Sequence, residues 1–305
     1  MRNFLILPIL FIFLVSCSNS EDFDIPKISK LEKLEEHSNQ FIKGIYSYDN
    51  GIHVAIGFGI ANSIMVEGEG GNIIIDTTDD VSQAKEVLSE FQKINQNPIK
   101  AIIYTHNHGD HVFGASEFYN AQEEKPLVIS HSTTAEKVEK ILGIINPIIT
   151  IRSGKMFGTN LDEDELINVG LGPYLSAGRS SPGYIAPTMT FEKELKLEIA
   201  GHKVELYHAP GETDDQLFVW FPELSALMPG DNFYTTFPNL YTIRGTSHRD
   251  VIGWVNSIDK MRSLDPQYLF PSHTMPVVGE EISNALIIYR DGMQYVHDQT
   301  VRLMN

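Results

Sequence analysis

The sequence contains a single cysteine among its 305 residues, which excludes an intramolecular disulfide framework. Basic residues are also scarce: 23 lysines and arginines stand against 40 aspartates and glutamates, and the formal net charge is -17. A nucleic-acid-binding protein normally presents a basic face to the phosphates, so this balance predicts no nucleic-acid partner. It also argues against simple electrostatic attachment to an anionic bilayer. A small anionic substrate stays compatible, because local cations can outweigh the global charge.

The first 17 residues have the pattern of an export signal. A short positive start precedes an almost unbroken apolar run, residues 4–15, which is too short to span a bilayer comfortably. The run ends in Leu14-Val15-Ser16-Cys17, which resembles the bacterial lipobox, in which the cysteine is lipidated. We therefore expect a lipoprotein signal peptide over residues 1–17, with Cys17 carrying a lipid that anchors an exported protein to a bacterial membrane, facing the periplasm or the extracellular side. The alternative is an ordinary signal peptide with an incidental cysteine.

The rest of the chain divides into a short tether and one large domain. Residues 18–42 are predicted to form the tether and an N-terminal segment, in which 27–37 is either a charged helix or more linker. Residues 43–305 show no internal linker, and the hydrophobic content of the whole chain, 42%, is close to that of soluble globular proteins. We expect one catalytic domain over 43–305.

Strand and helix patterns alternate along this domain. Period-2 alternation on both sides of Asn50-Gly51 predicts a hairpin, and Asp80 is placed to cap an amphipathic helix over 81–91. The Gly-, Ser- and Pro-rich stretch 146–187 is predicted to be a long functional loop. Further strands are expected at 63–66, 73–76, 99–104, 125–130, 189–199, 204–207, 217–221 and 226–228, and further helices at 135–142, 251–264 and 282–301. This order favours mixed sheets with helices outside them.

A dense group of metal-ligand side chains follows the predicted strand 99–104. The run reads His106-Asn107-His108-Gly109-Asp110-His111. Its side chains cannot all point the same way, but from a tight turn they can diverge toward two metal ions. Imidazole with carboxylate oxygen is typical of zinc or a similar first-row ion. The alternative, a polar turn with scattered histidines, would leave buried His and Asp groups unpaired at a considerable free-energy cost.

The pattern His-x-His-x-Asp-His after a strand resembles the signature of the metallo-β-lactamase superfamily. The resemblance implies an α+β fold of αββα type, a sandwich of two mixed β-sheets flanked by helices, with metal ligands on loops at one edge. The remaining ligands implied by register are Glu212 in Pro210-Gly211-Glu212-Thr213, the bridging Asp231, and His273. Asp214 and Asp215 are neighbouring rivals of Glu212. The other histidines lack such register and are expected at the surface or in packing: His37, His53, His131, His202, His208, His248 and His297.

Glu212 stands where most of the superfamily has a histidine, and this exchange is similar to the alkylsulfatase branch. The segment Asn239-Leu240-Tyr241-Thr242-Ile243-Arg244-Gly245, followed by Arg249-Asp250, also looks like that branch, as do Val169 to Gly172, Gly183 to Thr188 and His297 to Arg302. The resemblance implies that Arg244 holds a sulfate, which suits a forked guanidinium. Asn239 and Tyr241 are weaker substrate-binding candidates. For Arg244 the alternative is a structural pair with an aspartate.

Two departures from that branch stand out. Pro238 occupies a position where alkylsulfatases commonly have a histidine, which leaves the general acid unassigned. Relatives also carry a dimerisation region and a sterol-carrier-like domain after the catalytic domain, and we expect this chain to represent the catalytic domain only. A homodimer stays an open alternative.

The sequence therefore predicts a lipid-anchored hydrolase of alkyl or aryl sulfate esters with two divalent metal ions, Zn²⁺ being the first choice. His106, His108 and Glu212 would hold one ion, and Asp110, His111 and His273 the other, with Asp231 bridging. Asp110, Asp231 and Arg244 are the expected catalytic residues, acting on a water whose pKa the metals lower. The alternatives are another hydrolase of this fold, acting on a lactone, thioester, lactam or phosphodiester, and a non-catalytic metal-binding lipoprotein.

Overall fold

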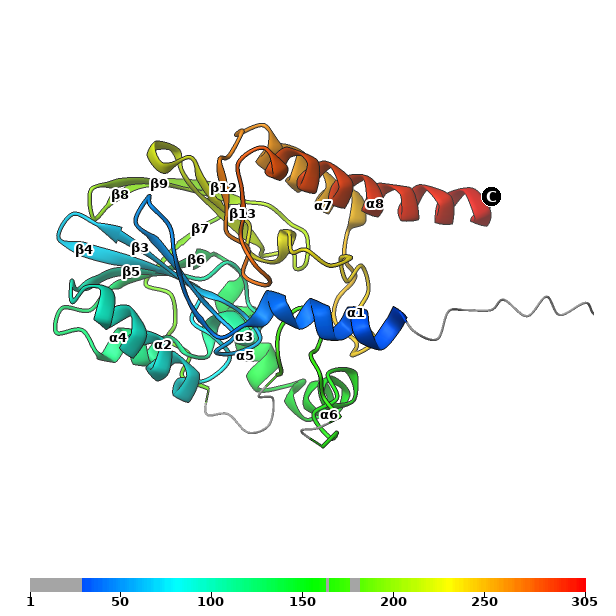
Figure 1. Ribbon diagram of the computed structural model, residues 1–305, viewed down its shortest axis with the longest axis horizontal. Helices are drawn as coiled ribbons and strands as arrows, with labels where there is room; N and C mark the ends of the chain where they lie inside the picture. The colour runs from blue at the N-terminus through cyan, green and yellow to red at the C-terminus, as the bar shows by residue number, and fades with distance from the viewer. Residues whose placement is uncertain (1–28, 163–164, 176–181) are drawn as a thin grey trace, which may run out of the picture.

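The computed structural model describes residues 29–162, 165–175 and 182–305. It contains two mixed β-sheets packed face to face, with helices on both outer faces (Figure 1). The predicted αββα sandwich is thereby confirmed. The predicted signal peptide, Cys17 and residues 18–28 lie outside the described residues.

The first sheet has seven strands in chain order, β1 to β7. Their bounds are β1 Gly44–Ser47, β2 Ile52–Ile56, β3 Ser63–Gly68, β4 Gly71–Ile75, β5 Ile99–Ile103, β6 Leu127–His131 and β7 Met189–Phe191. Strands β1 to β4 pair antiparallel, and β4 to β7 pair parallel. The hairpin predicted at Asn50-Gly51 is present: Ser47 pairs with His53, and Gly51 adopts a φ of 76°, which favours glycine.

The second sheet has six strands in the order β13-β12-β11-β10-β9-β8. Their bounds are β8 Glu194–Ile199, β9 His202–His208, β10 Leu217–Phe221, β11 Ala226–Met228, β12 Tyr268–Leu269 and β13 Val277–Val278. All neighbours pair antiparallel except β11 and β12, which run parallel.

The alternation of side chains along each strand produces three buried layers. Ile52 and Val54 of β2 and Leu206 of β9 belong to the core between the sheets. On the far side of the first sheet, Met65 packs with the helices α2 and α4. On the far side of the second sheet, Phe218 packs with α7 and α8. Each large side chain buried in these layers stabilises the fold by about 1.5–3 kcal/mol.

The helices lie outside the sheets and at their edges (Figure 1). Their bounds are α1 Ser29–His37, η1 Ser38–Phe41, α2 Val81–Ile94, α3 Gly109–Val112, α4 Ala115–Asn120, α5 Thr134–Leu142, α6 Asn146–Met156, η2 Pro222–Leu224, η3 Gly230–Asn232, α7 Val251–Arg262 and α8 Glu281–Met304. Asp80 caps α2 as predicted, because its side chain accepts hydrogen bonds from the backbone N–H groups of Ser82 and Gln83. In the described residues, none of these helices is both long enough and apolar enough to cross a membrane.

Two secondary-structure predictions were wrong. The stretch 146–187 was expected to be a loop, yet α6 occupies its first eleven residues. Pro147 lies in the first turn of α6, where the missing N–H costs no intrahelical hydrogen bond, so this proline does not prevent the helix. The predicted single strand 189–199 is two strands, β7 and β8, and the chain crosses between them from the first sheet to the second.

Candidate metal centre

Loops from both sheets bring the predicted metal ligands together at one edge of the sandwich. His106 and His108 follow strand β5, and Asp110 and His111 lie in the short helix α3. From the second sheet, Asp231 lies in η3 just after β11, and His273 comes four residues after β12. Because β11 and β12 run parallel, their carboxyl ends meet at the same edge, which explains how two residues so far apart in sequence become neighbours.

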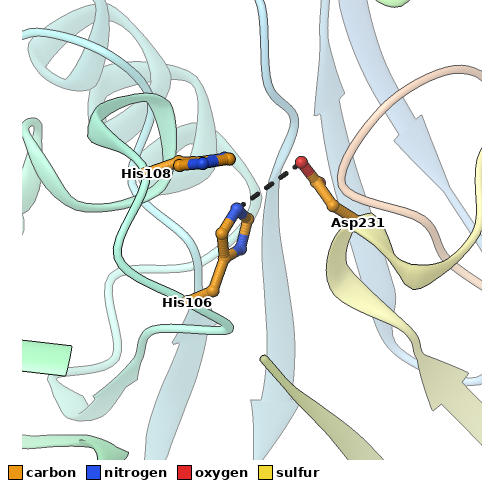
Figure 2. Close-up of side chains that lie close together, drawn as sticks. All are labelled: His106, His108 and Asp231. Carbon is orange, nitrogen blue, oxygen red and sulfur yellow. Dashed lines mark ion pairs between the residues drawn. The ribbon is translucent and has the colours of Figure 1, made fainter. Parts of the chain in front are cut away.

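Three of these side chains form a first cluster. The ligand atoms of His106, His108 and Asp231 lie within 4.8 Å of one another. Figure 2 shows the two imidazoles coming from the segment after β5 and the carboxylate approaching them from the opposite side. His106 Nε2 lies 3.5 Å from Asp231 Oδ2.

Asp110, His111 and His273 form a second cluster with the same compactness. The Nε2 atoms of His111 and His273 lie 3.3 Å and 3.5 Å from Asp110 Oδ2. They also lie 3.5 Å and 3.2 Å from the carboxylate oxygens of Asp231. Asp231 therefore faces both clusters, as expected of a bridging carboxylate.

The unused atoms of these residues fit a metal site. His106 Nε2, His111 Nε2 and Asp231 Oδ1 are buried and have no hydrogen-bond partner among the described residues. The other ring nitrogens are engaged: His106 Nδ1 lies 3.0 Å from Thr105 Oγ1, and His273 Nδ1 donates to the Ile60 carbonyl at 2.9 Å. Such outer contacts fix the ring orientation of metal-binding histidines. Nitrogen and oxygen donors in two groups of three suit divalent first-row ions.

The two clusters differ in their protonation. Burial lowers the pKa of His106, and it lowers the pKa of His108 to about 3, so both rings are neutral and offer lone pairs. Burial also lowers the pKa of His111 and His273, but Asp231 and the neighbouring carboxylates outweigh it. They raise the pKa of His273 to about 9 and that of His111 well above its ordinary value.

A cavity of about 360 Å³ opens directly over these clusters. Its polar floor includes His108, Asp110 and Asp231. Most of its wall is apolar and includes Ile60, Phe113, Ile141, Ile149, Phe157 and Leu171. Helix α6, together with Leu171, Leu175 and Pro182, supplies part of this wall, so described parts of the stretch predicted to be a functional loop line the cavity.

Comparison with known proteins agrees with this geometry. Residues 56–273 match the metallo-beta-lactamase superfamily. The chain belongs to that superfamily. Among its relatives, a linear primary-alkylsulfatase of Pseudomonas sp. (strain ATCC 19151) is 41% identical over 79% of this chain and 47% of its own length. An alkyl/aryl-sulfatase of Saccharomyces cerevisiae is 28% identical over 87% of this chain and 42% of its own length. The chain thus spans less than half the length of these two relatives.

Solved structures show the same fold. The stereoselective inverting sec-alkylsulfatase Pisa1 from Pseudomonas sp. superposes with a TM-score of 0.79 at 23% identity, over 86% of this chain and 43% of that one. A metallo-beta-lactamase family protein of Thermus thermophilus superposes with a TM-score of 0.62 at 17% identity, over 84% of this chain and 83% of that one. At these identities the likeness concerns the fold alone.

Within this superfamily site, Glu212 has a partner that the sequence did not predict. Both of its carboxylate oxygens accept hydrogen bonds from Arg249, Oε1 from Nη2 at 2.5 Å and Oε2 from Nη1 at 2.7 Å. Arg249 is 3% exposed and also donates to the backbone carbonyl of Asn239. Burial raises the pKa of Glu212 to about 7, and Arg249 opposes this shift. Glu212 lines the cavity beside His108 and Asp231, and its role as a metal ligand stays a prediction.

Asp76 is a second residue that the sequence did not single out. Its carboxylate is fully buried and accepts hydrogen bonds from the Thr105 hydroxyl at 2.8 Å and the Ser272 hydroxyl at 2.7 Å. It also lies 2.7 Å from His111 Nδ1 and thereby orients that ring. The only sequence signal was a carboxylate at the end of the buried run Ile73-Ile74-Ile75.

The predicted substrate residues differ in their positions. Arg244 lines the cavity, with its guanidinium 5.6 Å above the Phe157 ring and 3.9 Å from Met156 Sδ. It forms no ion pair with a carboxylate in the part of the chain that the structure describes, which does not support the alternative of a structural Arg–Asp pair. Asn239 also lines the cavity. Tyr241 does not line it, and its side chain is 66% exposed.

The histidines expected to be structural lie outside both clusters. His53 lies 2.6 Å from Glu67 Oε1, and His131 stacks on His208 with ring centroids 4.1 Å apart. Asp215, a rival of Glu212, is fully buried and accepts hydrogen bonds from Asn107 and Thr134. Asp214 pairs with Lys137. Neither aspartate belongs to a cluster.

Proposed function

We propose that this protein hydrolyses alkyl or aryl sulfate esters with two divalent metal ions, Zn²⁺ being the first choice. The observation that carries the proposal is Arg244, a cation without a carboxylate partner in the described part of the chain, on the wall of the cavity over the two clusters. The planar guanidinium group of Arg244 can donate parallel hydrogen bonds to two oxygens of a sulfate group. The similarity to proteins named alkylsulfatases supports this assignment.

The floor and the wall of the cavity have different roles in the proposed reaction. When bound, the metal ions would supply Lewis-acid stabilisation and an activated water. His106, His108, Asp110, His111, His273 and Asp231 would hold them, with Glu212 as the further ligand. Arg244 orients the anionic head of the ester, and Ile149 and Phe157 surround its organic part and exclude water from it. Pro238, at the position where relatives often have a histidine, cannot donate a proton to the leaving alcohol.

The balance of charge supports an anionic substrate. Two divalent ions and the carboxylates of Asp110, Glu212 and Asp231 would leave one net positive charge, which a hydroxide would cancel. Arg249 adds a positive charge beside Glu212, and Arg244 adds another on the cavity wall. Electrostatic attraction for a sulfate ester therefore arises locally, in spite of the global charge of -17.

A substrate panel tests the proposal. Metal-loaded protein is incubated with a short alkyl sulfate, an aryl sulfate, a lactone and a chromogenic lactam, and released sulfate is measured by ion chromatography. We expect sulfate release, and a loss of about 100-fold in kcat/KM in the variant Arg244→Met, since a charged partner of the transition state is removed. Arg302→Met, a matched change at an exposed position of α8, serves as the control. Turnover of the lactone or lactam without any sulfate release would overturn the proposal.

We further propose that the protein is exported and lipid-anchored through Cys17. The apolar run 4–15 and the lipobox-like Leu14 to Cys17 support this assignment. Expressed in a bacterium fed labelled palmitate, the full chain should carry the label and sediment with membranes, and Cys17→Ser should lose both properties. A label that persists in Cys17→Ser would contradict lipidation at this residue.

A further inference from the structure

A second cavity, of about 200 Å³, adjoins the first. The two share four lining residues: His108 and Glu212 on the floor, and Ile141 and Ile149 on the wall. Ile141 belongs to α5 and Ile149 to α6, so the contact between these two helices lies on the boundary between the cavities. The metal centre is therefore reached from two sides.

The linings of the two cavities differ in chemistry. Beyond the shared residues, the wall of the first is largely apolar. The second combines Ile145 and the Asp214 carboxylate with hydroxyl, amide and cationic groups: Asn107, Lys137, Lys140, Thr213, Ser247 and His248. An oxyanion that loses water against an apolar wall has no replacement hydrogen bonds, while the second lining supplies donors.

The charges along the second cavity leave a positive excess. Lys137 is neutralised by Asp214, with Nζ 2.7 Å from Oδ1, and Glu212 is neutralised by Arg249. Lys140 forms no ion pair with a carboxylate among the described residues. In addition, Thr213 Oγ1 is buried and has no hydrogen-bond partner there. The ammonium group of the exposed Lys140 and the unsatisfied hydroxyl of Thr213 are donors available to an oxyanion in this cavity.

We propose that the second cavity binds inorganic sulfate and is the route by which it leaves, while the alcohol leaves through the first. The inference rests on the proposed function. Hydrolysis of R–O–SO₃⁻ by one water gives R–OH and HSO₄⁻, which passes its proton to solvent at neutral pH. The alcohol is the more apolar product and suits the apolar wall of the first cavity. Sulfate is a dianion and suits the hydrogen-bond donors of the second cavity. Sulfate need not pass the organic group that still fills the first cavity.

Product inhibition tests the inference. Inhibition constants for inorganic sulfate and for a short alcohol are measured in wild type, Lys140→Glu and Ser247→Trp, and sulfate binding to the metal-loaded proteins is followed by calorimetry. Lys140→Glu should weaken sulfate inhibition and binding by about tenfold, because a charge-assisted contact becomes a repulsion, with alcohol inhibition unchanged. Ser247→Trp, which fills the cavity from an exposed position, should act in the same direction. Lys85→Glu, on the exposed side of α2, carries the same charge change and should alter neither constant.

The outcomes separate this inference from the function on which it rests. If the protein releases sulfate, and if Lys140→Glu and Ser247→Trp are inhibited by sulfate and bind it as wild type does, the second cavity is not the sulfate site. The proposed function would then stand. Absence of turnover on every sulfate ester, with sulfate binding that falls in Lys140→Glu but not in Lys85→Glu, would overturn the function and retain the cavity as an oxyanion site. Ser153→Trp, which fills the first cavity instead of the second, should weaken alcohol inhibition and leave sulfate inhibition unchanged.

Discussion

At the scale of single residues, the site depends on side chains that fix the position and charge of the candidate ligands. Arg249 is 3% exposed and grips both oxygens of Glu212, so neither charge is buried alone. Removing one member of such a pair is far more costly than removing both, because the remaining charge stays in a low-dielectric surrounding. The pair therefore contributes to the integrity of the fold as well as to the charge of the metal centre.

This pairing predicts how a single substitution changes stability. Arg249→Met should lower the free energy of unfolding of the metal-free protein by about 3 kcal/mol, because Glu212 loses its only strong cationic partner among the described residues. Zn²⁺ should reverse part of the loss, since a bound cation would replace the guanidinium as the partner of Glu212. Urea unfolding with and without Zn²⁺ measures both effects, with Arg262→Met, a partly exposed arginine on α7, as the control. Equal stabilities of Arg249→Met and wild type without metal would contradict the buried ion pair.

Six of the seven predicted ligands lie in the two clusters, because a local run and short motifs after strands carried their register. Asp76 and Arg249 escaped prediction for a physical reason. The carboxylate of Asp76 is held by Thr105 and Ser272, 29 and 196 positions away, and Arg249 meets Glu212 across 37 positions. No local pattern encodes such contacts. They exist only once both sheets have formed.

At the scale of elements, strand periodicity and helix caps located most of the structure correctly, and segments without periodicity did not. Helix α6 was missed because its Gly, Ser and Pro content is typical of loops, although Pro147 falls where a helix tolerates it. The crossing from β7 to β8 was missed because both strands alternate in the same way and only two residues separate them. Pairing partners, which decide the sheet to which a strand belongs, lie outside the reach of local patterns.

His131, the last residue of β6, is a titratable residue whose ring contacts the segment between β7 and β8. His131 Nε2 lies 3.1 Å from the Glu192 carbonyl, between β7 and β8, and Nδ1 lies 3.0 Å from Thr133 Oγ1, so the neutral ring is fully bonded. Burial lowers the pKa of His131, and the stacked ring of His208 lowers it further. The hydrogen bond to the Glu192 carbonyl, and after it the charges of Asp215 and Asp214, oppose the shift without reversing it.

This lowered pKa predicts the direction of a pH effect. Below about pH 6.5 the unfolded chain binds a proton at this residue before the folded protein does. The contribution of His131 to stability should therefore fall as the pH drops from about 7.5 to about 5.5. His131→Gln removes this contribution, so its stability relative to wild type should rise over this range, while the partly exposed His297→Gln should follow wild type. Urea midpoints across this range provide the measurement. A slope in His131→Gln as steep as in wild type would refute the assignment.

At the scale of the whole molecule, the αββα sandwich concentrates function at one edge. Three buried layers hold the sheets and helices together, while the loops after β5, β11 and β12 meet over a shared centre. Helices α5 and α6 meet at the boundary between the two cavities above this centre, since Ile141 and Ile149 line both. The fold class followed from the metal-ligand run and its resemblance to the superfamily. The division into two cavities did not, because it depends on a helix that the sequence did not indicate.

The most direct test of a two-metal sulfatase is sulfate release as a function of bound metal. Metal-free protein is titrated with Zn²⁺, bound metal per chain is measured by elemental analysis, and sulfate released from a short alkyl sulfate is followed in the same samples. Release should be negligible without metal and rise to a plateau at two ions per chain, and Asp231→Ala, which removes the carboxylate that faces both clusters, should abolish that plateau. Undiminished sulfate release from metal-free protein, or none at two ions per chain, would contradict the account.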